Sequence, residues 1–151
     1  MELVAVTGNS GKTVFSFYLA QFLSRQNKRV FLISTDSGKP AFKMLFPDRK
    51  SDGKRSLGRL LSLAAISEAK IFDNAYTVNK NLMMLSYADG ENPQTYPDIA
   101  EVNLKALMTE LGTLADTVVV DTATMQNRID KFVMTQNPKN VYIATDRKSV
   151  V

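Results

Sequence analysis

The chain has 151 residues, which suits one domain with a sizeable core and is too short for two ordinary domains. It contains neither cysteine nor histidine, which excludes disulfides, thiolate metal sites and catalytic triads built on histidine. The formal net charge of +4 is mildly basic, which is compatible with an anionic partner but does not indicate one.

The strongest motif of the sequence follows directly after its first predicted strand. Residues 2–7 form an apolar, β-branched run that predicts a buried strand, and apolar residues at helical spacing predict a helix over 13–26. A turn of small residues lies between them. Such a turn lets backbone amides converge on an anion beside a helix N-terminus, so a phosphate site is predicted here. Its predicted cofactor-binding residues are Gly8, Asn9, Ser10, Gly11, Lys12, Thr13 and Val14.

Two residues of this turn have predicted roles in the chemistry of a bound nucleotide. The Lys12 ammonium would stabilise the β- and γ-phosphates, and the Thr13 hydroxyl would bind Mg²⁺. The usual spacing of the motif places glycine five residues before Gly11, where this chain has Val6. The alternative interpretation is therefore a chance Gly-Lys-Thr in a turn between a strand and a helix.

The second predicted strand, residues 29–34, leads to a carboxylate at Asp36. A carboxylate at this end of the sheet can orient a water molecule toward a γ-phosphate, so Asp36 is the predicted catalytic partner of Lys12. The alternative role for Asp36 is to cap a turn. An irregular connection is expected over residues 39–55, followed by a helix over 57–66.

Basic residues are frequent in and just after this connection, with two phenylalanines among them. Such a stretch can follow a nucleic-acid backbone, although a solvated loop is the more common explanation, so nucleic acid is only a weakly supported partner. The residues concerned are Lys39, Lys43, Arg49, Lys50, Lys54, Arg55 and Arg59.

The second half of the chain continues the alternation of strands and helices. Strands are predicted at 81–86, 117–121 and 140–145, and helices at 98–111 and 127–136, with Asp98 and Glu101 as the start signal of the first helix. Asp121 ends the apolar run Val118-Val119-Val120, where a carboxylate can hold Mg²⁺ with Thr13. This order predicts an α/β fold: a three-layer α/β/α sandwich around a mainly parallel sheet, with residues 1–151 forming one domain.

The sequence resembles the ParA/MinD superfamily of deviant Walker-A ATPases, a SIMIBI-type branch of the P-loop NTPases. The family loop reads Lys-Gly-Gly-x-Gly-Lys-[Ser/Thr], which Gly8, Gly11, Lys12 and Thr13 match, whereas Asn9 replaces the second glycine and Thr7 stands at the signature lysine. Asp36 falls on the second aspartate of the family's Asp-x-Asp pair, with Ser34 at the first position. The family continues beyond this point, so the resemblance implies a domain shortened at its C-terminus.

The resemblance implies an ATP-binding, weakly hydrolysing switch ATPase with Mg²⁺ as cofactor. Such ATPases position cellular machinery, here a plasmid, conjugation, pilus or division apparatus, and the altered lysine favours the pilus-assembly and conjugation branch. A homodimer and protein partners from that machinery are the implied partners. The alternative is a non-catalytic scaffold that acts through protein contacts. No transmembrane segment or secretory signal is evident, so a cytoplasmic location is expected, with peripheral membrane association left open.

Overall fold

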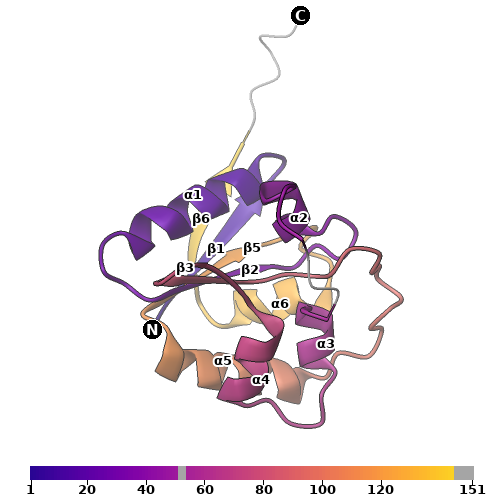
Figure 1. Ribbon diagram of the computed structural model, residues 1–151. Coiled ribbons are helices and arrows are strands. Elements are labelled where there is room, and N and C mark those ends of the chain that lie inside the picture. The colour runs from indigo at the N-terminus through magenta and orange to yellow at the C-terminus, as the bar shows by residue number, and fades with distance from the viewer. Residues whose placement is uncertain (51–53, 145–151) are drawn as a thin grey trace, which may run out of the picture.

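The computed structural model describes residues 1–50 and 54–144, and these ranges contain a sheet of six strands with helices on both sides (Figure 1). The strands are β1 (Glu2–Gly8), β2 (Val30–Ser34), β3 (Tyr76–Asn79), β4 (Leu82–Leu85), β5 (Thr117–Asp121) and β6 (Lys139–Ile143). The helices are α1 (Lys12–Ser24), α2 (Ala41–Leu45), α3 (Leu57–Leu61), α4 (Glu68–Asn74), α5 (Glu101–Leu114) and α6 (Arg128–Thr135).

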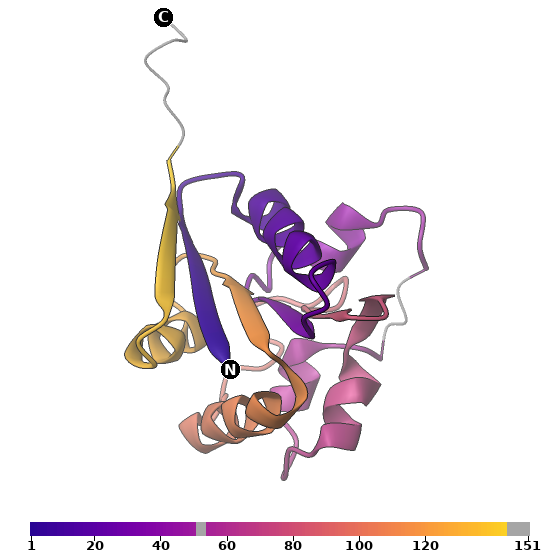
Figure 2. The same cartoon turned by 90° about the vertical axis from the view of Figure 1, so that its left-hand side faces the viewer.

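The sheet has the order β3-β4-β2-β5-β1-β6, and every neighbouring pair is parallel except β3 and β4. Helices α1 and α2 cover one face, and α3, α4, α5 and α6 cover the other (Figures 1 and 2). This arrangement confirms the predicted α/β fold with a mainly parallel sheet. All five residues of both β2 and β5 are buried, which explains why their apolar runs do not alternate with polar residues.

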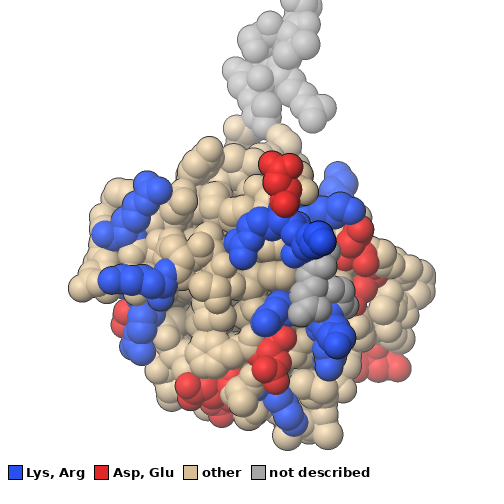
Figure 3. All heavy atoms as spheres, viewed as in Figure 1, with Lys and Arg blue, Asp and Glu red and all other residues tan. Residues whose placement is uncertain are grey.

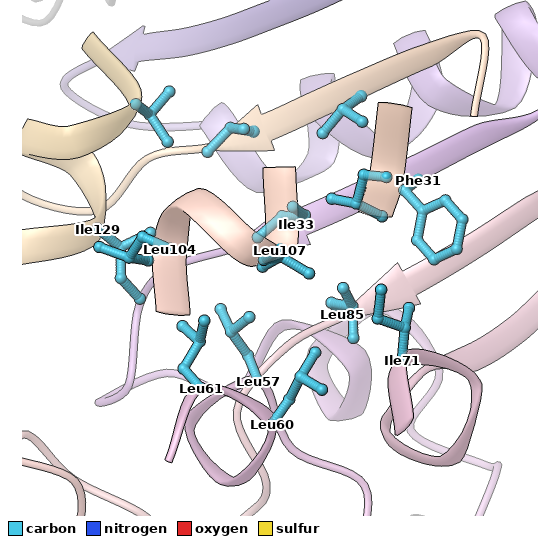
Figure 4. Packing of buried hydrophobic residues seen from close by; sticks show 14 of the residues in the cluster. Phe31, Ile33, Leu57, Leu60, Leu61, Ile71, Leu85, Leu104, Leu107 and Ile129 are labelled. Carbon is cyan, nitrogen blue, oxygen red and sulfur yellow. The ribbon is translucent and has the colours of Figure 1, made fainter. Parts of the chain in front are cut away.

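Alternate residues of each central strand point into different halves of the core. Phe31 and Ile33 of β2 belong to the half of the core that also contains residues of α3, α4, α5 and α6, and Phe31 lies near Ile71 of α4 in Figure 4, whereas Leu32 belongs to the half on the α1 side. Leucines from α3 and α5 fill the space below the sheet, chiefly Leu57, Leu60, Leu61, Leu104 and Leu107. The sheet therefore has no solvated face in its centre, and polar groups are confined to its ends.

The connections that follow the adjacent strands β1 and β5 run to opposite faces of the sheet. The chain leaves β1 through α1 toward β2, and it leaves β5 through α6, on the opposite face, toward β6. Because β1 and β5 are neighbours, the loops after them separate at the carboxyl ends of the strands. Open α/β sheets bind ligands at such a switch point.

Several local predictions were wrong. The helix predicted over 98–111 begins at Glu101, and its N-cap is Ala100 without a side-chain hydrogen bond, so Asp98 does not start it. The connection expected to be irregular contains α2, and the helix predicted over 57–66 ends at Leu61. Helix α4 and the antiparallel strand β3 were not predicted. The last residue of the strand predicted over 140–145 lies outside the described residues.

None of the helices in the described parts of the chain has the length and apolar character needed to cross a lipid bilayer.

Candidate phosphate-binding site

The turn after β1 has a backbone conformation that depends on its two glycines. Gly8 has φ 133°, and a Cβ atom there would lie 1.9 Å from the carbonyl oxygen of Ile143 in β6. Gly11 has φ 75° and is the N-cap of α1. Both values fall in the left-handed region that glycine adopts at little cost. The two glycines therefore let the chain pass close to β6 and then enter α1 directly.

The first three amides of α1 lack hydrogen-bond acceptors among the described residues. Helix α1 has no side-chain cap, and Phe15 is the first of its residues whose amide bonds back, to the carbonyl of Gly11. The amides of Lys12, Thr13 and Val14 donate no hydrogen bond to any other described residue. Three free donors at the positive end of a helix form an anion site. Phosphate binding by this turn stays a prediction, and the three free amides are consistent with it.

Lys12 lies across the mouth of this turn. Its ammonium donates to the carbonyl of Gly8 at 2.8 Å and to the carbonyl of Ala123 at 3.1 Å. Ala123 belongs to the loop after β5, so this one side chain joins the two loops that separate at the crevice. Both acceptors are neutral carbonyls, which a phosphate oxygen can replace with a stronger, charge-assisted hydrogen bond.

The two predicted metal residues are in direct contact. The Thr13 hydroxyl donates to Oδ2 of Asp121 at 2.6 Å, and the Ser34 hydroxyl donates to the same oxygen at 3.2 Å. The other oxygen, Oδ1, is buried and has no partner among the described residues. Burial raises the pKa of Asp121, and the hydrogen bonds from Thr13 and Ser34 offset this effect only in part.

These residues fit a magnesium ion bound together with a nucleotide. An orphaned carboxylate oxygen beside a threonine hydroxyl provides hard oxygen ligands, and Mg²⁺ takes few protein ligands because it keeps several waters and binds substrate phosphates. The described residues contain no cluster of three or more acidic side chains that would hold a metal without phosphate. The donor set therefore suits Mg²⁺ with nucleotide better than a permanent metal.

Asp36 lies two residues beyond β2 and is half-buried. Its Oδ1 atom accepts from the amides of Gly38 at 2.9 Å and Lys39 at 3.2 Å, so the turn-capping role is present in the structure. Asp36 is also close enough to Asp121 to raise the pKa of that residue slightly. The turn fixes the Asp36 carboxylate near the crevice, and its role in orienting water stays a prediction.

The positions that depart from the family motif are held by β6. The Thr7 hydroxyl donates to Oδ1 of Asn140 at 2.9 Å, and the Tyr142 hydroxyl donates to Oδ1 of Asn9 at 3.1 Å. The Asn9 amide donates to the carbonyl of Ile143. Because both Thr7 and Asn9 pair with the neighbouring strand, they stabilise the turn from the side opposite to α1. Ser10 also belongs to the turn, so all the predicted residues lie together.

A buried carboxylate that sequence reasoning missed organises the loop after β5. Asp130 is fully buried in α6 and accepts from the Thr35 hydroxyl at 2.6 Å and from the amides of Ala123 at 3.0 Å and Met125 at 3.1 Å. Burial raises the pKa of Asp130 despite these hydrogen bonds. Asn127 caps the amide of Asp130 at 2.7 Å. The spacing of Asn127 and Asp130 is a helix-start signal, but only the fold reveals that the carboxylate points inward.

The basic stretch is largely occupied by contacts within the protein. Arg55 donates to the carbonyls of Phe72, Asp73 and Ala75 at the end of α4. Lys43 pairs with Asp89 at 2.6 Å, and the Arg49 guanidinium lies over the rings of two phenylalanines, Phe42 and Phe46. On the face shown in Figure 3, acidic side chains lie among the basic ones. These contacts favour the structural explanation of the stretch over nucleic-acid binding.

Comparison with known proteins identifies a family for the chain. Residues 3–150 match the family described as the CobQ/CobB/MinD/ParA nucleotide binding domain. Among curated proteins, no individual sequence matches the chain.

Solved structures share the fold at low sequence identity. The kinase domain of Escherichia coli tyrosine kinase ETK matches 97% of the chain with a TM-score of 0.74 and 20% identity. The septum site-determining protein MinD from Pyrococcus horikoshii, crystallised with Mg-ADP, matches 94% with a TM-score of 0.68 and 15% identity. A ParA family ATPase from Chlorobium tepidum matches 95% with a TM-score of 0.68 and 12% identity. The chain covers only 56%, 57% and 59% of these three proteins, respectively.

Proposed function

The chain belongs to the CobQ/CobB/MinD/ParA nucleotide-binding domain family, and from this premise we propose that it binds ATP with Mg²⁺ and hydrolyses it slowly. In this proposal the nucleotide state acts as a switch that positions a larger cellular assembly. The replacement of the family's signature lysine by Thr7 favours a pilus-assembly or conjugation apparatus over plasmid partition or cell division.

The contact between Thr13 and Asp121 carries the proposal. The two residues lie 108 positions apart in the chain, yet the hydroxyl and the carboxylate are 2.6 Å apart beside three free amides. A structural role alone would not require the second carboxylate oxygen to be buried without a partner. A cation and a polyphosphate would satisfy the free amides and the orphaned oxygen together.

Each predicted residue then has a distinct task. The amides of Lys12, Thr13 and Val14 would bind phosphate oxygens, and the Lys12 ammonium would exchange its contact with Ala123 for the β- and γ-phosphates. Thr13 and Asp121 would hold Mg²⁺, which supplies charge neutralisation at the phosphates. Asp36 would orient the water molecule that attacks the γ-phosphate.

Slow turnover is expected because the positive charge of the family's signature lysine is missing from this chain. Thr7 offers a neutral hydroxyl, and that hydroxyl already donates to Asn140. A single added cation at a phosphoryl-transfer site commonly accounts for a rate factor of about 10³ to 10⁵. The same observation supports the second candidate function, a scaffold that binds nucleotide without hydrolysing it.

Calorimetric titration with ATP and Mg²⁺, together with a turnover assay, tests both candidates. The matched pair is Lys12→Ala, which removes the predicted phosphate contact, and Lys80→Ala, an exposed lysine in the turn between β3 and β4. We expect binding and slow turnover in the wild type and in Lys80→Ala, and loss of both in Lys12→Ala. Binding without turnover would favour the scaffold. No binding in the wild type would overturn both candidates.

A further inference from the structure

A second pocket adjoins the phosphate site at the carboxyl ends of β2 and β5. It has a volume of about 290 Å³ and is lined by the turn after β2, the segment before α5 and the start of α6. Ala123, whose carbonyl accepts from Lys12, forms part of its wall. Lys12, Thr13 and Asp121 do not line this pocket, whereas Asp36, the residue proposed to orient water, does line it.

The Tyr87 side chain lines this pocket and is 7% exposed. No hydrogen bond joins its hydroxyl to another described residue, and this oxygen is not among the fully enclosed polar atoms that lack a partner, so the pocket leaves it accessible. Burial, with smaller effects from Glu91, Asp130 and Tyr96, raises the pKa of Tyr87 to about 12. The hydroxyl therefore keeps its proton at ordinary pH and can donate a hydrogen bond to a ligand.

Further donors come from the start of α6. The amides of Arg128 and Ile129 precede the capped amide of Asp130, and neither donates to another described residue. Both residues line the pocket. The Arg128 guanidinium donates to the carbonyl of Ile99 through one nitrogen at 2.6 Å, and it adds a positive charge to the positive end of the helix. Free amides, a guanidinium and a phenol hydroxyl are all donors, so they select a ligand with acceptor atoms and negative charge.

The acidic groups near this pocket accept hydrogen bonds from nearby donors. Asp130 accepts hydrogen bonds from Thr35, Ala123 and Met125. Glu91 accepts from the Ser56 hydroxyl, the Ala88 amide and the Tyr96 hydroxyl. Asp36 accepts two amides of its own turn. Because local donors stabilise these three carboxylates, their presence does not remove the preference of the helix start for an anion.

One part of the wall is apolar. Tyr96, Ile99 and two prolines line it, and the rings of Tyr87 and Tyr96 rest on Gly58 of α3. A Cβ atom at Gly58 would lie 2.3 Å from the Tyr96 ring and 2.8 Å from the Tyr87 ring. Glycine at this position therefore lets both rings pack against α3. An aromatic wall of this kind favours a ligand with an apolar body.

We propose that this pocket binds a small organic carboxylate with an apolar body, such as an aromatic acid. Its carboxylate lies at the start of α6 within reach of the Tyr87 hydroxyl, and its body contacts Tyr96 and Ile99. The proposal does not depend on nucleotide binding, because it uses the amides of α6 and not those of α1.

NMR titration of the full chain with benzoate, benzamide and benzylamine tests the proposed ligand class. We expect saturable shifts for residues 36–38, 96–99 and 127–129 with benzoate, and binding at least about fivefold weaker for the neutral and cationic probes. Absence of saturable shifts with benzoate would overturn the proposal, as would equal binding of the three probes.

Substitutions test whether the Tyr87 hydroxyl contacts the bound benzoate. Tyr87→Phe keeps the buried ring and removes only the hydroxyl, so we expect benzoate to bind about fivefold more weakly. Tyr18→Phe, the same change at an exposed position on α1, serves as the control and should bind as the wild type does. Unchanged affinity in Tyr87→Phe would contradict the proposed contact. Lys12→Ala should retain benzoate binding while losing ATP, so failure of one proposal can be distinguished from failure of the other.

Discussion

The Thr35 hydroxyl donates a 2.6 Å hydrogen bond to the buried carboxylate of Asp130, which lies 95 positions further along the chain. Thr35 follows β2 and Asp130 belongs to α6, so the bond connects the turn after β2 with the helix that follows β5. Asp130 also binds the amides of Ala123 and Met125, and Ala123 in turn accepts from Lys12. Through these contacts the loop after β5 is fixed between the phosphate turn and the start of α6.

Thr35→Val should loosen this loop. Valine has the same shape but leaves the buried Asp130 carboxylate with one hydrogen bond fewer, which costs about 1–3 kcal/mol of unfolding free energy. Urea unfolding measures the loss, and hydrogen exchange of the Ala123 and Met125 amides should be faster. Thr109→Val, at an exposed position of α5, is the control and should change little. Equal effects of the two substitutions would argue against the role given to Thr35.

The two glycines of the phosphate turn should differ in their tolerance of alanine. Gly11→Ala places a Cβ atom in open space, so its only cost is the left-handed backbone, which should lower the free energy of unfolding by about 1–2 kcal/mol. Gly8→Ala adds a collision with the backbone of Ile143, so it should cost roughly 3 kcal/mol or more and weaken the pairing of β1 with β6. Urea unfolding of both variants checks the order. A smaller loss for Gly8→Ala would show that β6 can move away.

Asp121→Asn should change the pH dependence of stability in the nucleotide-free protein. Because burial raises the pKa of Asp121 above its unfolded value, the native state binds the proton more tightly, and the contribution of this group to stability is lost as pH rises through the folded pKa. The neutral amide does not titrate. We therefore expect the nucleotide-free variant to gain stability relative to the wild type as pH rises above the unfolded pKa of 3.8 and through the raised folded pKa.

The same variant should lose the magnesium dependence of ATP binding, since the amide is a poorer ligand for Mg²⁺ than a carboxylate. Urea unfolding at several pH values and calorimetry with and without Mg²⁺ provide the two measurements. A stability difference that stays constant with pH would contradict the raised pKa of Asp121.

Arg55→Gln should destabilise the protein. Arg55 donates to three carbonyls at the end of α4, and loss of these charge-assisted bonds costs about 1.5–3 kcal/mol. Lys50→Gln, an exposed residue of the same basic stretch, is the matched control and should leave unfolding unchanged. If the stretch served nucleic acid instead, both variants would retain full stability, and both would weaken binding of single-stranded DNA in a fluorescence titration.

Local sequence information determined the main elements of the fold and the phosphate turn. Strands β2 and β5 are buried on both faces, so their composition alone separates them from the amphipathic helices. The order of Gly8, Gly11, Lys12 and Thr13 between a strand and a helix also predicts an anion site. This prediction needs only local information, because the direction of the amides and the polarity of the helix are local properties.

Only the tertiary structure decided which distant side chains fix the loop after β5 and which basic residues make structural contacts. The sequence predicted the pairing of Asp121 with Thr13 and offered turn capping as one role of Asp36, but it gave no role to Asp130, which is buried under the loop after β5. Likewise, the sequence suggests that Arg55 is a solvated surface charge, but in the structure its guanidinium donates to a carbonyl at the end of α4. Hydrogen bonds between distant segments depend on strand order and burial, which arise from packing of the whole sheet and not from any local pattern.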